Sequence, residues 1–240
     1  MGDKMEKITS EKSLATNLSD KYGQQTWVRA LVQAIPYVGG SLDTLVSAQG
    51  QRLREERLNH YVSEIGENVR GLEEKFERLI TNSGEETFDL FRSHIENVDR
   101  CRSANKRKRF ANILLNQVER NANWEEPDTA TRILNSITDT HVVILNAICN
   151  AKVCPKPFEG LKITMIEIPQ KKDDSFLQEF LILAQAFPSV PSSQLRLIVT
   201  ELVSAGLVKD EGVGRWGATA MEKFSPLPTA TWFISWIERG

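Results

Sequence analysis

Apolar residues recur every three or four positions through the first half of the chain, the spacing that puts them on one face of an α-helix. No proline lies between Leu42 and Ile80, so the pattern predicts one long helix that ends at the polar run 81–84. Gly50, Gly66 and Gly71 allow a bend inside it, because glycine costs about 1 kcal/mol relative to alanine in a helix interior. The apolar stripe of its second half is regular: Leu58, Tyr61, Val62, Ile65, Val69, Leu72, Phe76, Leu79 and Ile80.

The same periodicity predicts three further helices over 85–102, 106–121 and 128–136. Long helices joined by short polar links are typical of an antiparallel bundle. Residues 1–24 are polar and carry scattered charges, and we expect them to form a flexible N-terminal extension of the bundle. The first domain is therefore predicted to be a helical bundle over 25–136.

A broken apolar segment, 27–47, opens this bundle. Pro36 disfavours helix in the residue before it, and Gly39 and Gly40 weaken helix after it, so these three residues are a candidate hinge. The segment resembles one that recurs in uncharacterised bacterial proteins, and it also resembles the Pro/Gly-broken helices of membrane-acting bundles. Two interpretations stay open: a buried core hairpin, which we favour, and a hairpin that inserts into a membrane after a conformational change. A spanning helix needs about 20 mainly apolar residues, which each half lacks.

The last hundred residues change character, because prolines and glycines interrupt short apolar runs. A helix is predicted first and a strand second, followed by two helices, a hairpin and a closing helix. The expected ranges, in that order, are 138–150, 161–168, 175–187, 192–205, 206–217 and 229–238. In the closing helix we expect four large apolar residues to dock this domain onto the bundle: Trp232, Phe233, Trp236 and Ile237.

The run IVTELVSAGLVKDEGVGRWGAT (198–219) resembles the third helix and wing of the winged-helix superfamily. That resemblance places Gly206 just past the helix, in left-handed backbone geometry that favours glycine. It implies a winged-helix-like domain over 137–240, and such domains bind DNA, RNA or protein, or merely pack. The expected fold class is mainly α: an N-terminal antiparallel long-helix bundle plus a small α+β winged-helix-like C-terminal domain.

Charge argues against nucleic acid as the first choice of partner. The formal net charge is −2 and charged residues make up 26% of the chain, so no global field attracts phosphates. The winged-helix face offers three cations, Arg196, Lys209 and Arg215, and non-specific DNA binding usually takes more phosphate contacts than that. We therefore favour a protein partner or self-association over DNA.

One basic cluster stands out, at the predicted junction of two helices. It could hold the phosphates of a nucleic acid or of an anionic lipid. It could instead complement the negative end of a helix dipole and pair with the acidic long helix, and we favour this structural interpretation. The cluster consists of Arg100, Arg102, Lys106, Arg107, Lys108 and Arg109.

Candidate catalytic chemistry is sparse. The histidines His60, His94 and His141 are scattered, and His94 is expected on a polar helix face beside Glu96 and Asp99. No phosphate-binding glycine loop with its lysine and no nucleophile elbow occurs, and the three cysteines have no metal-ligand spacing. We therefore expect no enzyme activity, no cofactor and no metal.

The cysteine count and the polar N-terminus favour a cytoplasmic location, since neither a disulfide framework nor a secretory leader is evident. The leading functional hypothesis is a non-enzymatic interaction or regulatory adaptor, with the bundle for assembly and the second domain for macromolecular contact. Two alternatives stay open: a membrane-perturbing helical effector that uses residues 27–47, and a DNA-binding transcriptional regulator.

Overall fold

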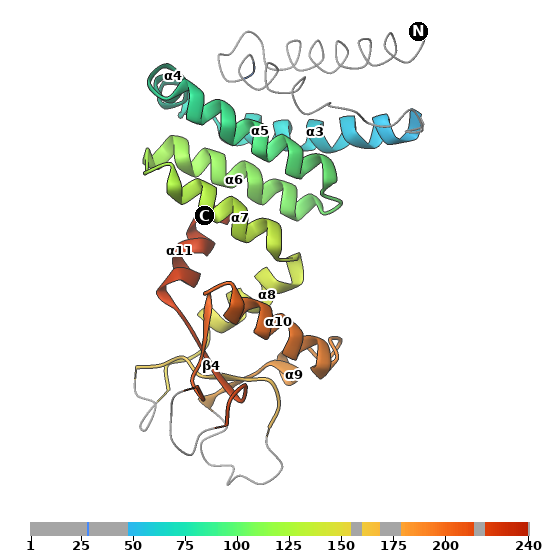
Figure 1. The fold of residues 1–240 in the computed structure, drawn as a ribbon, viewed down its shortest axis with the longest axis vertical. Coiled ribbons are helices and arrows are strands. Elements are labelled where there is room, and N and C mark those ends of the chain that lie inside the picture. Colours follow the sequence, from blue (N-terminus) through green and yellow to red (C-terminus); the bar gives the residue numbers. More distant parts are fainter. Residues whose placement is uncertain (1–27, 29–47, 155–159, 169–178, 214–218, 240) are drawn as a thin grey trace. The chain divides into compact units, whose positions relative to one another are not determined.

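The computed structural model describes residues 28, 48–154, 160–168, 179–213 and 219–239. These residues are mostly helical, with one small four-stranded sheet (Figure 1). The expected fold class, mainly α with a small α+β part, is confirmed. The chain divides into two compact units, one of residues up to Asn135 together with Trp236–Gly240, and one of Ser136–Ser235. The predicted boundary put all residues after 136 in the second domain. In the structure, residues 236–239 instead belong to the first unit.

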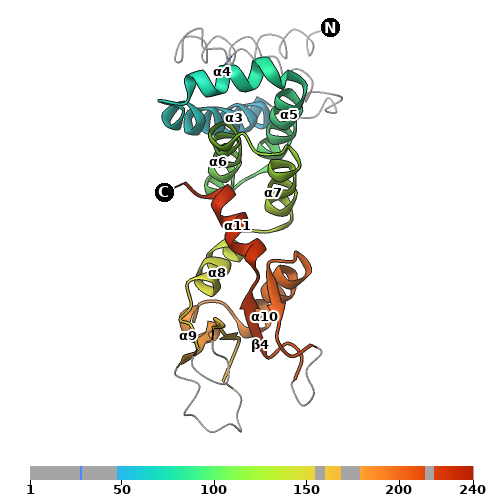
Figure 2. The same cartoon turned by 90° about the vertical axis from the view of Figure 1, so that its left-hand side faces the viewer.

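The described part of the first unit contains five consecutive helices, among which α6 is central (Figure 2). Ten of its seventeen residues are buried, and it packs on α3, α4 and α5. Buried polar residues on this helix therefore have to find their partners inside the unit. The helices are α3 (Ala48–Asn68), α4 (Glu73–Asn82), α5 (Gly84–Arg100), α6 (Ala104–Arg120) and α7 (Glu125–Ser136).

The continuous helix predicted through Ile80 is wrong, because α3 ends at Asn68 and α4 begins at Glu73. Gly71 lies between them with φ +81, a left-handed conformation that glycine adopts without strain. The turn is closed by two hydrogen bonds. The Leu72 amide donates to the Val69 carbonyl at 2.8 Å, and the Gly71 amide donates to Glu73 Oε2 at 2.7 Å.

His94 is not on a polar face, as the sequence suggested, but is completely buried. Its Nδ1 shares a hydrogen bond of 3.0 Å with the Tyr61 hydroxyl, and its Nε2 shares one of 2.9 Å with Thr131 Oγ1. The imidazole also packs against the ring of Phe110, with 5.4 Å between centroids. Side chains of α3, α5, α6 and α7 thus meet at this one residue.

The second unit joins short helices to a four-stranded sheet of order β2-β1-β4-β3. Strand β1 pairs parallel with β2 and antiparallel with β4, and β3 and β4 form an antiparallel hairpin. The core of this unit lies between the sheet and helices α8 and α10. The elements are α8 (Asp139–Cys149), β1 (Thr164–Met165), β2 (Leu181–Ile182), α9 (Leu183–Ala186), α10 (Ser192–Ser204), β3 (Val208–Asp210), β4 (Lys223–Pro226) and α11 (Pro228–Ile237).

Three predictions for this unit need correction. Within the range 161–168, only Thr164–Met165 is strand. The described part of the predicted helix 175–187 holds the strand β2 and the four-residue helix α9. The hairpin partner of β3 is β4, at 223–226, and not the segment before residue 217. The connection between these strands is therefore longer than the sequence suggested.

Candidate functional site

Arg107, at the centre of the basic cluster, is buried rather than presented to solvent. Its Nη1 donates to the carbonyl oxygens of Cys101 and Arg102, each at 3.0 Å. Ser103 caps the start of α6 at the same turn, because its Oγ accepts from the Lys106 amide at 3.1 Å. Arg107 therefore holds the α5–α6 connection by supplying a donor to two successive carbonyls of the backbone.

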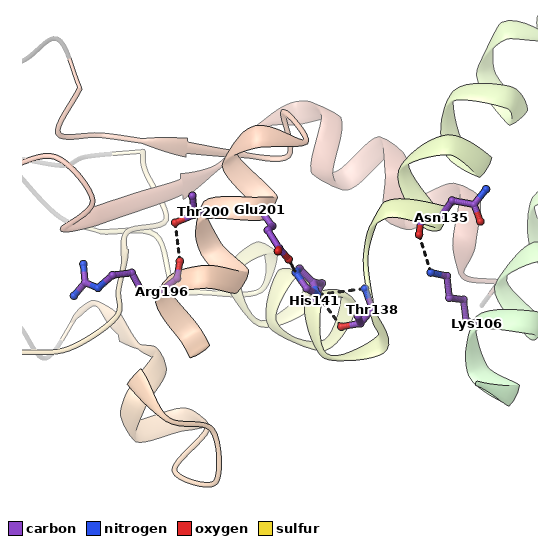
Figure 3. Close-up of polar contacts among 7 residues, drawn as sticks. All are labelled: Lys106, Asn135, Thr138, His141, Arg196, Thr200 and Glu201. Atoms are coloured by element: carbon purple, nitrogen blue, oxygen red, sulfur yellow. Dashed lines mark hydrogen bonds and ion pairs between the residues drawn. The ribbon is translucent and has the colours of Figure 1, made fainter. Parts of the chain in front are cut away.

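The lysines of the cluster also have partners within the first unit. Lys106 Nζ donates to the carbonyl of Asn135 at 3.1 Å, at the end of α7 (Figure 3). Lys108 Nζ lies 3.8 Å from Glu64 Oε2 on α3. Arg100 and Arg102 have exposed side chains. Three of the six residues, Lys106, Arg107 and Lys108, thus contact groups of their own unit, whereas Arg100 and Arg102 are exposed and Arg109 is half-buried.

Replacing Arg107 by alanine is expected to lower the free energy of unfolding by about 2 kcal/mol, the scale of buried hydrogen bonds made by a charged group. The matched control is Arg102→Ala, which removes an exposed guanidinium from the same connection and should change stability by less than about 0.5 kcal/mol. Chemical denaturation of both variants measures the difference. Equal effects of the two substitutions would contradict the structural role of Arg107.

The candidate hinge residues Pro36, Gly39 and Gly40, and the whole of 29–47, lie outside the described residues. Arg215, the third cation of the predicted winged-helix face, also lies outside them. The structure therefore describes two of the three cations expected on that face, Arg196 and Lys209.

Those two cations lie next to acceptors of their own unit. Arg196 is exposed on α10, and its Nη1 is 3.5 Å from the carbonyl oxygen of Met221. Lys209 Nζ lies 3.2 Å from Glu211 Oε2, whose carboxylate is buried and also accepts from Ser225 Oγ at 2.6 Å. These contacts compete with any phosphate for the same positive charges.

His141 links α8 to α10, a role that the sequence analysis did not assign to it. Its Nδ1 accepts from the backbone amide of Thr138 at 3.2 Å, while Thr138 caps the start of α8 (Figure 3). Its Nε2 lies 2.5 Å from Glu201 Oε2 on α10. The signal in the sequence was the spacing T-x-x-H at a helix start, which is the spacing of a capping box. The link fixes a carboxylate on the outer side of α10.

A pocket of about 550 Å³ lies beside Arg196 in the second unit. Its charged lining consists of Arg196, Glu167 and Glu222, so two carboxylates accompany the one guanidinium. Such a lining disfavours a polyanion, since each added phosphate would meet negative charge. The remaining lining residues are Ile166, Ile168, Thr219, Ala220 and Met221.

Within the described parts of the chain, no group of three histidine, cysteine, aspartate or glutamate side chains is placed to hold a metal ion. No helix among the same residues combines the length and the apolar character needed to cross a membrane. No protein-family model matches the sequence, and comparisons with curated proteins and with solved structures find no match.

Proposed function

We propose that the protein is a non-enzymatic interaction or regulatory adaptor whose second unit is winged-helix-like and contacts a protein partner. The order of elements supports the winged-helix part of this proposal. Helix α8 is followed by strands β1 and β2, by helices α9 and α10, and by the hairpin β3–β4. Helix α10 ends close to Gly206, which has φ +70, and the hairpin begins two residues later. This is the geometry that the resemblance of residues 198–219 implies.

The observation that carries the partner assignment is the outer surface of α10. Leu197 is 58% exposed there, so an apolar side chain lies on the outer face of this helix. Arg196 is the one basic residue of α10, and Glu201, which is also exposed, contacts His141. A helix that reads DNA presents several basic or amide side chains to bases and phosphates. An exposed leucine between single charges of each sign is better suited to a protein surface.

A photo-crosslinking amino acid at position 197 tests this assignment. In cells that express the protein, we expect a discrete crosslinked protein at this position. The control places the same amino acid at the exposed Glu77 of the first unit, where we expect no discrete product. Crosslinks of equal yield at both positions, or none at position 197, would argue against α10 as the contact surface.

We expect no complex with duplex DNA tighter than about micromolar at physiological salt, the range of non-specific binding. The physical reason is the small number of available cations on α10 and β3 and the carboxylates beside them. A gel-shift titration with the full chain measures this affinity, and release of dye from anionic liposomes in parallel measures membrane activity. A nanomolar shift that Arg196→Glu abolishes would favour a DNA-binding regulator, and dye release would favour the membrane-perturbing effector.

A further inference from the structure

The carboxyl end of α11 belongs to the first unit and contacts α6. We refer to Trp236–Arg239 as the arm. The last carbonyls of a helix have no partner within that helix. Here Asn112 Nδ2 donates to the carbonyl of Ile237 and Asn116 Nδ2 donates to that of Trp236, each at 2.8 Å. Two asparagines one helical turn apart thus bind two successive carbonyls of the arm.

The side chains of the arm are matched as closely as its backbone. Trp236 is fully buried, and the Arg120 guanidinium lies 4.8 Å from the centre of its ring. Arg239 Nη2 lies 3.0 Å from Glu119 Oε2, and its Nη1 is 3.3 Å from Asn116 Oδ1. The residues Asn112, Asn116, Glu119 and Arg120 therefore form a receptor site that recognises a helix end by its carbonyls, its tryptophan and its arginine.

Both the arm and the receptor site bury groups that favour their association. Departure of the arm removes the carbonyl acceptors of Asn112 and Asn116, both nine-tenths buried, at a cost that favours reoccupation of the site. It also exposes Trp236 to water. An arm that leaves its own receptor site is therefore strongly favoured to enter another, and the helix end that fits is present in every copy of the chain.

The arm is also suited to exchange by its place in the chain. Ser235 and Trp236 are consecutive in α11 but fall in different compact units. Domain swapping exchanges one element between identical copies, and a segment that clusters with a different unit from the residues before it is a suitable element.

We propose that the receptor site accepts the arm of a second copy of this chain, giving a domain-swapped dimer. At low concentration each arm occupies its own site, because a tethered segment acts at an effective concentration of order millimolar. The swapped form is favoured when the contact between an arm and its own receptor site is weakened, or when the protein concentration is high. This surface is separate from α10, so the proposal stands or fails independently of the proposed adaptor function.

Complementation between two variants tests the exchange. The receptor variant, Asn112→Leu with Asn116→Leu, keeps its arm but lacks the two donors. The arm variant, Trp236→Ala with Arg239→Ala, keeps its receptor site but lacks the matching side chains. Light scattering after size exclusion is expected to show monomers for each variant alone and a one-to-one complex after mixing. The control mixes the receptor variant with a chain that carries all four substitutions, which should give no complex.

A mixture that stays monomeric, while circular dichroism shows both variants folded, overturns the proposal. If either variant does not fold, a second measurement decides. A fluorescent peptide of residues 228–240 is titrated into the full-length wild-type chain, beside the same peptide with Trp236→Ala. The native peptide is expected to bind at least about tenfold more tightly, a difference of about 1.4 kcal/mol, since it displaces the chain's own arm. Equal binding of the two peptides overturns the proposal.

Discussion

Replacing Gly212 by alanine is expected to destabilise the second unit by about 2 kcal/mol or more, the cost of overpacking a closed site. A Cβ at this position would stand 2.1 Å from the carbonyl oxygen of Thr219, so backbone has to move. The same turn is held by Asp210, whose Oδ1 accepts from the Gly212 amide at 2.9 Å and whose Oδ2 accepts from the Met221 amide at 2.7 Å. The displacement therefore also strains the contacts that close the β3–β4 connection.

For a unit of this size, a change of that magnitude lowers the melting temperature by on the order of 10 °C. Hydrogen exchange followed by mass spectrometry over residues 136–235 measures the loss in the unit concerned. Gly84→Ala is the matched control, because no atom lies within 4 Å of the added Cβ at the start of α5. It should leave stability unchanged or raise it slightly. Equal protection in wild type and Gly212→Ala would show that the connection yields without cost.

The long helices were predictable because each carries its apolar stripe over several turns. The expected ranges 85–102 and 106–121 differ from α5 and α6 by one or two residues at each end. The bend at Gly71 was harder to place, since the apolar spacing continues through it to Leu72 and Phe76. Strands β1 and β2 have two residues each and α9 has four, which is too short for any period to be recognised.

The positions of the side chains in the basic cluster could be predicted only in part. The sequence showed six cations in ten residues, but charge alone does not tell which guanidinium is turned inward. Arg107 is buried because two carbonyls of the preceding loop need a donor, and that need arises from backbone geometry. The receptor site could not be predicted from the sequence either, because its partners are also backbone carbonyl groups. Asn112 and Asn116 bind carbonyl oxygens of Trp236 and Ile237, and every residue type has such an oxygen.

His94→Gln is expected to make the first unit less sensitive to acid. Burial lowers the pKa of His94 to about 3, from 6.5 in an exposed histidine. Between these values the unfolded chain binds a proton at this residue and the folded chain does not. The free energy of unfolding therefore falls on acidification by up to about 1.4 kcal/mol per pH unit, or about 2 kcal/mol in total between pH 7 and pH 5. Glutamine also has a polar end with donor and acceptor atoms, but it does not titrate.

At pH 7 the variant is expected to be less stable than wild type, because an amide cannot match both hydrogen bonds and the contact with Phe110. At pH 5 that deficit should be smaller by about 2 kcal/mol, since only wild type then bears the cost of keeping an imidazole neutral. Urea denaturation of both proteins at the two pH values measures the change, and carboxylates that titrate in both cancel in the difference. A deficit that is the same at pH 7 and pH 5 would show that the fold does not hold His94 in its neutral form.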